Sequence, residues 1–185
     1  MKKFVCPWWF GYFLLIPFRR YAQDPDRMLR PHIKPGMTVM DVGPGMGFFS
    51  LPMARLVGES GRVVCVDLQE KMIRGLKKRA ARAGLLERME LRVCTGTSLC
   101  IADLAGVIDF ALASAVVHEV PDARDFFSEV LASLKQGGQL LFSEPRGHVG
   151  KDDFDSALSS AREAGFVLES FLEIPRSRTV LLRRS

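Results

Sequence analysis

The chain has 185 residues, of which 48% are hydrophobic, and its formal net charge is +5. This length is typical of one compact domain with a substantial core. The basic residues are spread along the sequence and no run of about 18 apolar residues occurs, so neither a nucleic-acid-binding tract nor a transmembrane span is predicted.

The cysteines and histidines indicate no metal site. The four cysteines are Cys6, Cys65, Cys94 and Cys100, and their spacing does not match that of zinc or dithiol motifs. The three histidines are scattered along the chain. Cys65 and Cys94 lie in apolar, strand-like runs, so we expect both to be buried thiols. Such cysteine usage is typical of a reducing compartment, and we expect a cytoplasmic protein.

The first thirty residues differ from the rest of the chain. Both tryptophans lie in an aromatic run that ends at Phe18, and Pro7 and Pro17 interrupt that run, which argues against a secretion signal. We therefore divide the chain into an N-terminal cap or lid segment, residues 1–30, and a main domain, residues 31–185. Three roles stay open for this segment. It could cover the core, form a lid over a substrate pocket, or make a peripheral contact with a membrane or a partner protein.

Strands and helices alternate through the rest of the chain. A short helix is predicted to start at Asp24-Pro25-Asp26 and to run through Leu29. Pro52 lies one turn into the next predicted helix and removes a backbone donor there, so we expect a bend or a late helix start. In chain order, the predicted strands are 38–42, 62–67, 89–94, 107–113, 139–143, 166–174 and 178–182, and the predicted helices are 48–57, 70–83, 122 to the glycines at 137–138, and 154–164.

Two of these helices carry an apolar stripe that is predicted to face the core. The inward residues are expected to be Met72, Ile73, Leu76, Ala80 and Ala83 in one helix, and Phe126, Phe127, Val130, Leu131 and Leu134 in the other. The connection at 175–177 is so short that the last two strands must be antiparallel. The sequence therefore predicts an α/β, Rossmann-like fold, with a mainly parallel seven-stranded sheet, helices on both faces and a C-terminal antiparallel hairpin.

A glycine-rich turn follows the first strand. Gly43, Gly45 and Gly47 form a GxGxG pattern, one residue shorter than the GxGxxG pattern of dinucleotide-binding proteins. Asp67 ends the second strand about twenty residues later, where a carboxylate accepts hydrogen bonds from ribose hydroxyls. Asp41 precedes the first glycine and would repel a pyrophosphate but attract a cationic ligand. S-adenosylmethionine is cationic and carries no phosphate, so it fits this pattern better than a dinucleotide.

At this point the sequence resembles the class I S-adenosylmethionine-dependent methyltransferases, particularly the small-molecule branch that includes quinone-biosynthesis enzymes. The resemblance covers residues 30–182. The motifs that carry it are Asp41-Val42-Gly43-Pro44-Gly45-Met46-Gly47, Val66-Asp67, Val117-His118-Glu119-Val120-Pro121-Asp122, Leu134-Lys135-Gln136-Gly137-Gly138 and Ala164-Gly165-Phe166.

The resemblance implies S-adenosylmethionine as the cofactor and a set of residues that hold it. Asp67 would bind the ribose, Leu68 would lie against the adenine, and Ser114 would lie near the methionine part. Thr95 stands where the family often has an aspartate for the adenine amino group. The full cofactor-binding set is predicted to be Asp41, Gly43, Pro44, Gly45, Gly47, Asp67, Leu68, Thr95, Gly96 and Ser114.

Two residues after the fourth strand are candidates for catalysis. Methyl transfer from a sulfonium depends mainly on positioning, and a base is needed only for a poorly ionised acceptor. His118 is the best candidate for a general base and Glu119 the second, while a role of His118 in loop orientation or ligand contact stays open. His148, near Glu144, is expected to border the acceptor pocket, and His32 is expected to be structural.

The resulting hypothesis is an S-adenosylmethionine-dependent methyltransferase that acts on a small molecule by in-line transfer. The main alternative is a non-catalytic S-adenosylmethionine-binding or regulatory protein of the same fold. Two further alternatives are a nicotinamide-dependent enzyme and an arsenic methyltransferase that uses Cys6, Cys94 and Cys100. No nucleic-acid partner is expected.

Overall fold

The computed structural model describes residues 24–185, so the predictions for the aromatic run lie outside the described residues. These residues divide into two compact units, 24–94 and 95–185, and each is described by itself. The short helix α3 (Pro25–Leu29) forms as predicted, because the Asp24 carboxylate accepts hydrogen bonds from the backbone N–H groups of Asp26 and Arg27. No helix within residues 24–185 is long and apolar enough to cross a membrane.

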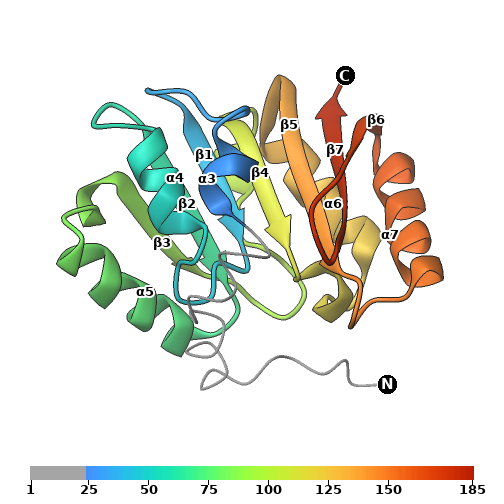
Figure 1. The fold of residues 1–185 in the computed structure, drawn as a ribbon, viewed down its shortest axis with the longest axis horizontal. Coiled ribbons are helices and arrows are strands. Elements are labelled where there is room, and N and C mark those ends of the chain that lie inside the picture. The colour runs from blue at the N-terminus through green and yellow to red at the C-terminus, as the bar shows by residue number, and fades with distance from the viewer. Residues whose placement is uncertain (1–23) are drawn as a thin grey trace. The chain divides into compact units, whose positions relative to one another are not determined.

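The first unit is a three-stranded parallel sheet with the strand order β3-β2-β1 (Figure 1). The connections from β1 through α4 to β2 and from β2 through α5 to β3 run in the same direction across the sheet. Because such connections are right-handed, α4 and α5 lie on the same face of the sheet. After α3, the elements are β1 (Thr38–Val42), α4 (Ser50–Leu56), β2 (Arg62–Asp67), α5 (Glu70–Arg82), the 3₁₀ turn η1 (Leu86–Arg88) and β3 (Met89–Val93).

The bounds of β1 and β2 agree with the prediction, and α4 shows the late start that Pro52 was expected to cause. The helix begins at Ser50, which makes Pro52 its third residue. A backbone N–H in the first turn has no acceptor inside the helix, so proline is tolerated there. Cys65 is fully buried as predicted. The prediction for Cys94 was wrong, because β3 ends at Val93 and the Cys94 side chain is only half-buried.

The apolar stripe of α5 was predicted correctly except at its end. Met72, Ile73, Leu76 and Ala80 are buried against β2 and β3. Ala83 is exposed, because the helix ends at Arg82 and Ala83 only caps it.

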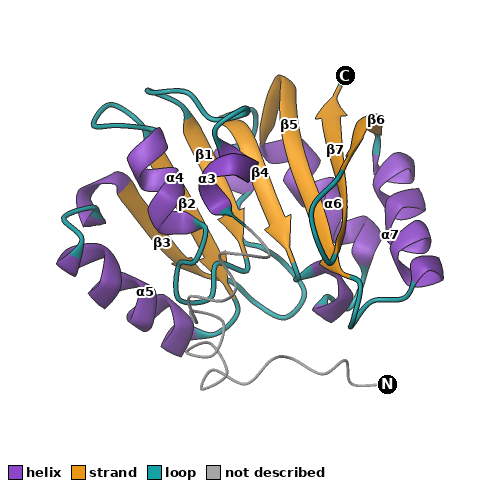
Figure 2. Ribbon diagram, in the orientation of Figure 1, coloured by secondary structure: helices purple, strands orange, loops and turns teal. Residues whose placement is uncertain are grey.

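The second unit contains four strands in the order β4-β5-β7-β6, with α6 and α7 packed side by side (Figure 2). β4 and β5 are parallel, whereas β7 runs antiparallel to both β5 and β6. Its elements are the 3₁₀ turn η2 (Ala102–Leu104), β4 (Ile108–Ser114), the 3₁₀ turn η3 (Val117–Glu119), α6 (Ala123–Ser133), β5 (Leu134–Pro145), α7 (Lys151–Ala164), β6 (Phe166–Leu172) and β7 (Ser177–Arg184).

The predicted end of α6 was wrong. The helix ends at Ser133, and β5 already begins at Leu134 instead of Gln139. The pairing with β4 shifts register between Ile108 and Phe110, so the glycines form an irregular start of β5 and do not cap the helix. Leu134 is therefore buried as a strand residue, and Leu131 is half-buried.

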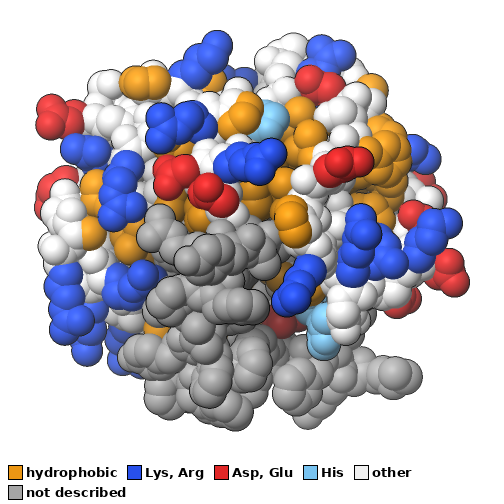
Figure 3. Space-filling view, viewed as in Figure 1, with side chains coloured by type: hydrophobic (Ala, Val, Ile, Leu, Met, Phe, Trp, Pro, Cys, Tyr) orange, Lys and Arg blue, Asp and Glu red, His pale blue; other side chains and the backbone are white. Residues whose placement is uncertain are grey.

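The other bounds in this unit differ from the prediction by a few residues. α7 begins at Lys151, three residues before the predicted start, and stops as predicted before Gly165, whose φ of 111° ends the helix. The seven strands are mainly parallel and end in an antiparallel hairpin, which confirms the predicted fold class. Figure 3 shows Lys and Arg side chains interspersed with acidic and hydrophobic ones on the face viewed, as is typical of solvated surface charges.

Candidate functional site

The glycine-rich loop between β1 and α4 depends on backbone conformations that favour glycine. Gly43, Gly45 and Gly47 have φ values of 70°, 54° and 85°. A Cβ on Gly47 would lie 2.4 Å from the Leu76 Cδ1 atom, whereas a Cβ on Gly45 would meet no atom of residues 24–185 within 4 Å. Within these residues, the loop is thus packed tightly against α5 at Gly47 and open at Gly45, where a ligand can approach the backbone.

Helix α5 supports this loop from one side. A Cβ on Gly75 would lie 3.3 Å from the Met46 side chain, so Gly75 leaves room for that methionine. The Arg79 guanidinium donates a hydrogen bond to the Met46 carbonyl. These contacts fix the loop and leave the face of Gly45 uncovered within the described residues.

The structure brings Asp67 against this loop, as the sequence predicted. Its Oδ2 atom accepts a hydrogen bond of 3.1 Å from the Gly45 N–H, and its Oδ1 atom accepts one of 2.8 Å from the Gln69 N–H. Burial raises the pKa of the Asp67 carboxyl to about 6, although the two backbone donors act in the opposite direction. Leu68, next to it, is 43% exposed and presents an apolar surface.

The raised pKa of Asp67 predicts a pH dependence of stability. The folded protein retains this proton to a higher pH than the unfolded chain, whose carboxyl has a pKa near 3.8. The free energy of unfolding should therefore fall as the pH rises from about 4 to 6, by up to about 3 kcal/mol. Urea unfolding of wild type and Asp67→Asn across this range isolates the contribution, since other carboxyls cancel in the difference. Identical pH profiles of the two proteins would contradict it.

Asp41 lies at the start of the same loop but points into the core. It is 2% exposed, and the Ser50 hydroxyl donates a hydrogen bond of 2.5 Å to its Oδ2 atom. Asp41 thus ties β1 to the first residue of α4 and holds the ends of the loop together. Its predicted contact with a cationic ligand stays a prediction.

Three predicted cofactor residues belong to the second unit. The Thr95 hydroxyl accepts a hydrogen bond from the Ser98 N–H and lies 3.3 Å from the Ser98 carbonyl, which closes a small turn beside Gly96. Ser114 ends β4, and Ala115 follows it with a φ of 57°. The roles of Thr95, Gly96 and Ser114 in cofactor binding stay predictions.

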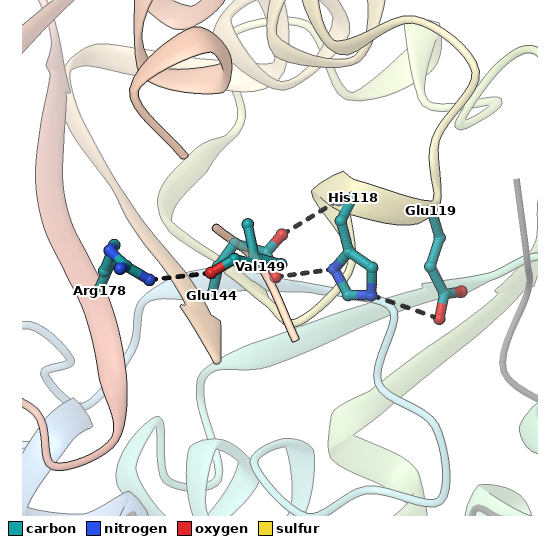
Figure 4. A network of polar contacts seen from close by, with 5 residues as sticks. All are labelled: His118, Glu119, Glu144, Val149 and Arg178. Atoms are coloured by element: carbon teal, nitrogen blue, oxygen red, sulfur yellow. Dashed lines mark hydrogen bonds and ion pairs between the residues drawn. The ribbon is translucent and has the colours of Figure 1, made fainter. Parts of the chain in front are cut away.

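Both predicted catalytic residues lie on η3, beyond the carboxyl end of β4. Figure 4 shows His118 between the carboxylates of Glu119 and Glu144. Glu144 Oε2 lies 2.8 Å from His118 Nδ1, and Glu144 Oε1 accepts a 3.1 Å hydrogen bond from the His118 backbone N–H. Glu119 Oε1 lies 3.9 Å from His118 Nε2, which is beyond hydrogen-bond distance.

The sequence placed Glu144 at the end of β5 but indicated no role for it. Glu144 is 2% exposed. The available signal was a carboxylate that directly follows the apolar run of a buried strand, where an acid needs a specific partner. That partner is His118, which comes from a different segment of the chain.

A cavity of about 420 Å³ lies beside this pair, within the second unit. His148 borders it, and its ring centroid lies 4.8 Å from that of His118. The predicted place of His148 beside the methyl acceptor stays a prediction. The lining residues are Val117, His118, Ala123, Glu144, His148, Val149, Asp153, Phe154, Ser156, Ala157 and Ser160. Among the described residues, no group of three or more His, Cys, Asp or Glu side chains is arranged to hold a metal ion.

Comparisons with known proteins identify a family model and relatives that the chain resembles. A family model described as a methyltransferase domain matches residues 33–170. The ubiquinone/menaquinone biosynthesis C-methyltransferase UbiE of Hydrogenovibrio crunogenus is 30% identical over 112 residues, which cover 60% of this chain and 43% of that protein. The arsenite methyltransferase of Halobacterium salinarum is 30% identical over 110 residues, covering 60% of this chain and 27% of that protein. The match thus spans less than half the length of these curated relatives.

The fold has a close match among solved structures. A SAM-dependent methyltransferase from Aquifex aeolicus superposes with a TM-score of 0.87 at 22% sequence identity, and the match covers 98% of this chain and 100% of that one. At this level of identity, the comparison shows a shared fold.

Proposed function

The chain belongs to the methyltransferase-domain family, and from this premise we propose that it transfers a methyl group from S-adenosylmethionine to a small organic molecule. The observation that carries the proposal is the hydrogen bond from the Gly45 N–H to Asp67, beside an open glycine face. A carboxylate at this place accepts hydrogen bonds from the hydroxyl groups of a ribose. Asp41, before the first glycine, disfavours a pyrophosphate by charge repulsion.

The residues of the first unit fit this cofactor. Asp67 has acceptor lone pairs beyond the two that its backbone partners use, and ribose hydroxyls donate to such a carboxylate. Gly45 offers backbone surface without a Cβ, and the exposed Leu68 offers an apolar surface for a flat base. When bound, the cofactor supplies an electrophilic methyl group on a sulfonium. The chain's part is to hold and orient the cofactor and to exclude water.

The acceptor that we propose is organic. The names of the relatives point to quinones in one case and to arsenite in the other. Arsenic chemistry needs several thiolates that converge, and Cys65 is fully buried in the core of its unit, which leaves Cys94 and Cys100 among the described cysteines. We place the reaction in the cytoplasm, in keeping with the cysteine usage of the sequence.

The test of this function is the formation of S-adenosylhomocysteine. The full chain, incubated with S-adenosylmethionine and a panel of phenols, quinols and alcohols, should convert the cofactor with at least one acceptor above the rate without acceptor. Cofactor binding by calorimetry with no conversion on any acceptor would favour the non-catalytic, regulatory alternative. Binding of NADH but not of S-adenosylmethionine would favour a nicotinamide-dependent enzyme.

A further inference from the structure

Helix α5 carries the whole excess positive charge of the chain. Its thirteen residues include six basic side chains and one acid, Glu70, so its formal net charge is +5. The chain as a whole also has a formal net charge of +5, because its other residues contain equal numbers of basic and acidic side chains. The basic residues of the helix are Lys71, Arg74, Lys77, Lys78, Arg79 and Arg82.

Four of these residues form a straight row on the outer face of α5, which we call the α5 row. The row consists of Lys71, Arg74, Lys78 and Arg82, which follow one another at intervals of three, four and four residues and extend over about 16 Å. All four side chains are exposed, and the apolar stripe that packs against β2 and β3 lies on the opposite side of the helix. Lys and Arg side chains occupy the lower left of Figure 3, where Figure 1 places α5.

The stability of the helix does not account for the α5 row. Like charges three or four residues apart repel each other, and Glu70, which lies 3.5 Å from Arg74, is the only acid of the helix. Lys71 lies in the first turn, where the helix dipole disfavours a cation. Within residues 24–185, the side chains of Lys78 and Arg82 form no ion pair or hydrogen bond. An anionic partner would relieve this repulsion.

The outer face of α5 lacks the side chains that bind the bases of a nucleic acid. The helix contains no aromatic residue on which a base could stack, and no Asn or Gln that could pair with the edge of a base. A straight row on a convex helix presents its charges together to a flat surface. These properties favour the head groups of anionic phospholipids as the partner.

The composition of the first 23 residues favours the same partner. Both tryptophans and both tyrosines of the chain occur there, and every charged side chain among these residues is basic. Tryptophan and tyrosine are enriched at the interface between membrane and water, and basic residues beside them are typical of segments that contact anionic lipids. The segment therefore supplies no acid that could neutralise the α5 row.

We propose that the α5 row docks the protein on a membrane surface that contains anionic phospholipids. The apolar stripe of α5 is buried within its own unit, so the contact is electrostatic and reaches the head groups without insertion of the helix. The negative potential of such a surface attracts each Lys or Arg, and salt weakens the attraction. The inference concerns where the protein binds and does not depend on the proposed methyl transfer.

The Lys78→Glu variant tests this proposal without a loss of helix stability. The new carboxylate lies four residues from both Arg74 and Arg82, so it replaces two repulsive pairs by two attractive ones. Arg124→Glu is the matched control, because Arg124 is an exposed residue in the first turn of α6, where the helix dipole favours an acid. Both substitutions change the net charge of the protein equally.

The measurement is sedimentation of the full chain with lipid vesicles. Wild type and Arg124→Glu should bind vesicles of phosphatidylcholine mixed with phosphatidylserine, and raised salt should release them. Binding of Lys78→Glu should be weaker by about tenfold, because the charge of the row falls by two. Equal binding to vesicles of phosphatidylcholine alone, or an equal loss of binding in both variants, would overturn the proposal.

A competition experiment distinguishes the lipid surface from a nucleic acid. Single-stranded polyuridine, added at the same phosphate concentration as the phosphatidylserine, should leave most of the protein on the vesicles. Release of the protein into a complex with the RNA, absent in Lys78→Glu, would assign the α5 row to a nucleic acid and overturn the assignment to lipid.

Discussion

Asp67→Ala should weaken the binding of S-adenosylmethionine by more than tenfold. The carboxylate lies against the open glycine and is 8% exposed, so its hydrogen bonds to a ligand form where water competes poorly. A charged hydrogen-bonded contact of this kind is worth roughly 1.5 to 3 kcal/mol, which corresponds to a loss of about tenfold to a hundredfold. Isothermal titration calorimetry of the two proteins measures the difference.

Glu59→Ala is the control for this measurement. Glu59 belongs to the same unit, but its side chain is 94% exposed and forms a 3.8 Å ion pair with Arg88 at the surface. Its removal should leave the affinity for the cofactor unchanged. An affinity of Asp67→Ala equal to that of wild type would show that the ribose is not bound here.

The second large effect is expected at the glycines of the loop, where two substitutions should act differently. Gly47→Ala should lower the free energy of unfolding by about 2 to 4 kcal/mol, because the new Cβ would overlap the buried Leu76 and the backbone φ is 85°. Gly45→Ala has only the strain of a positive φ and should lower it by about 1 to 2 kcal/mol.

The ranking of the two variants by loss of stability should reverse when they are ranked by loss of affinity for S-adenosylmethionine. The Cβ of Gly45→Ala meets no atom of the described residues and lies on the face proposed for the cofactor, so this variant should lose affinity out of proportion to its small loss of stability. Urea unfolding and calorimetry on the same preparations give both quantities. Gly45→Ala with full affinity would place the ligand elsewhere, and equal losses of stability would contradict the packing argument.

Local pattern was sufficient to predict most of the first unit, apart from the ends of α5 and β3. The bounds of β1 and β2 follow from short apolar runs with clear turn signals at their ends, and the loop and Asp67 come together because adjacent parallel strands end at the same edge. Pro52 even indicated the late start of α4.

The failures occurred where tertiary structure decides. The glycines at 137–138 are typical of a helix end, yet they lie in β5, because the shifted pairing with β4 draws the chain into the sheet earlier. Glu144 was located correctly at the end of its strand, but its role depends on His118, which is 26 residues away. No periodicity within a single element carries that information.

A structure of the full chain with S-adenosylhomocysteine tests the central claim most directly. We predict that the ribose hydroxyls lie within hydrogen-bond distance of the Asp67 carboxylate and that the nucleoside contacts the backbone at Gly45. A ribose bound away from Asp67, or a loop that holds a phosphate-bearing nucleotide in its place, would contradict the account.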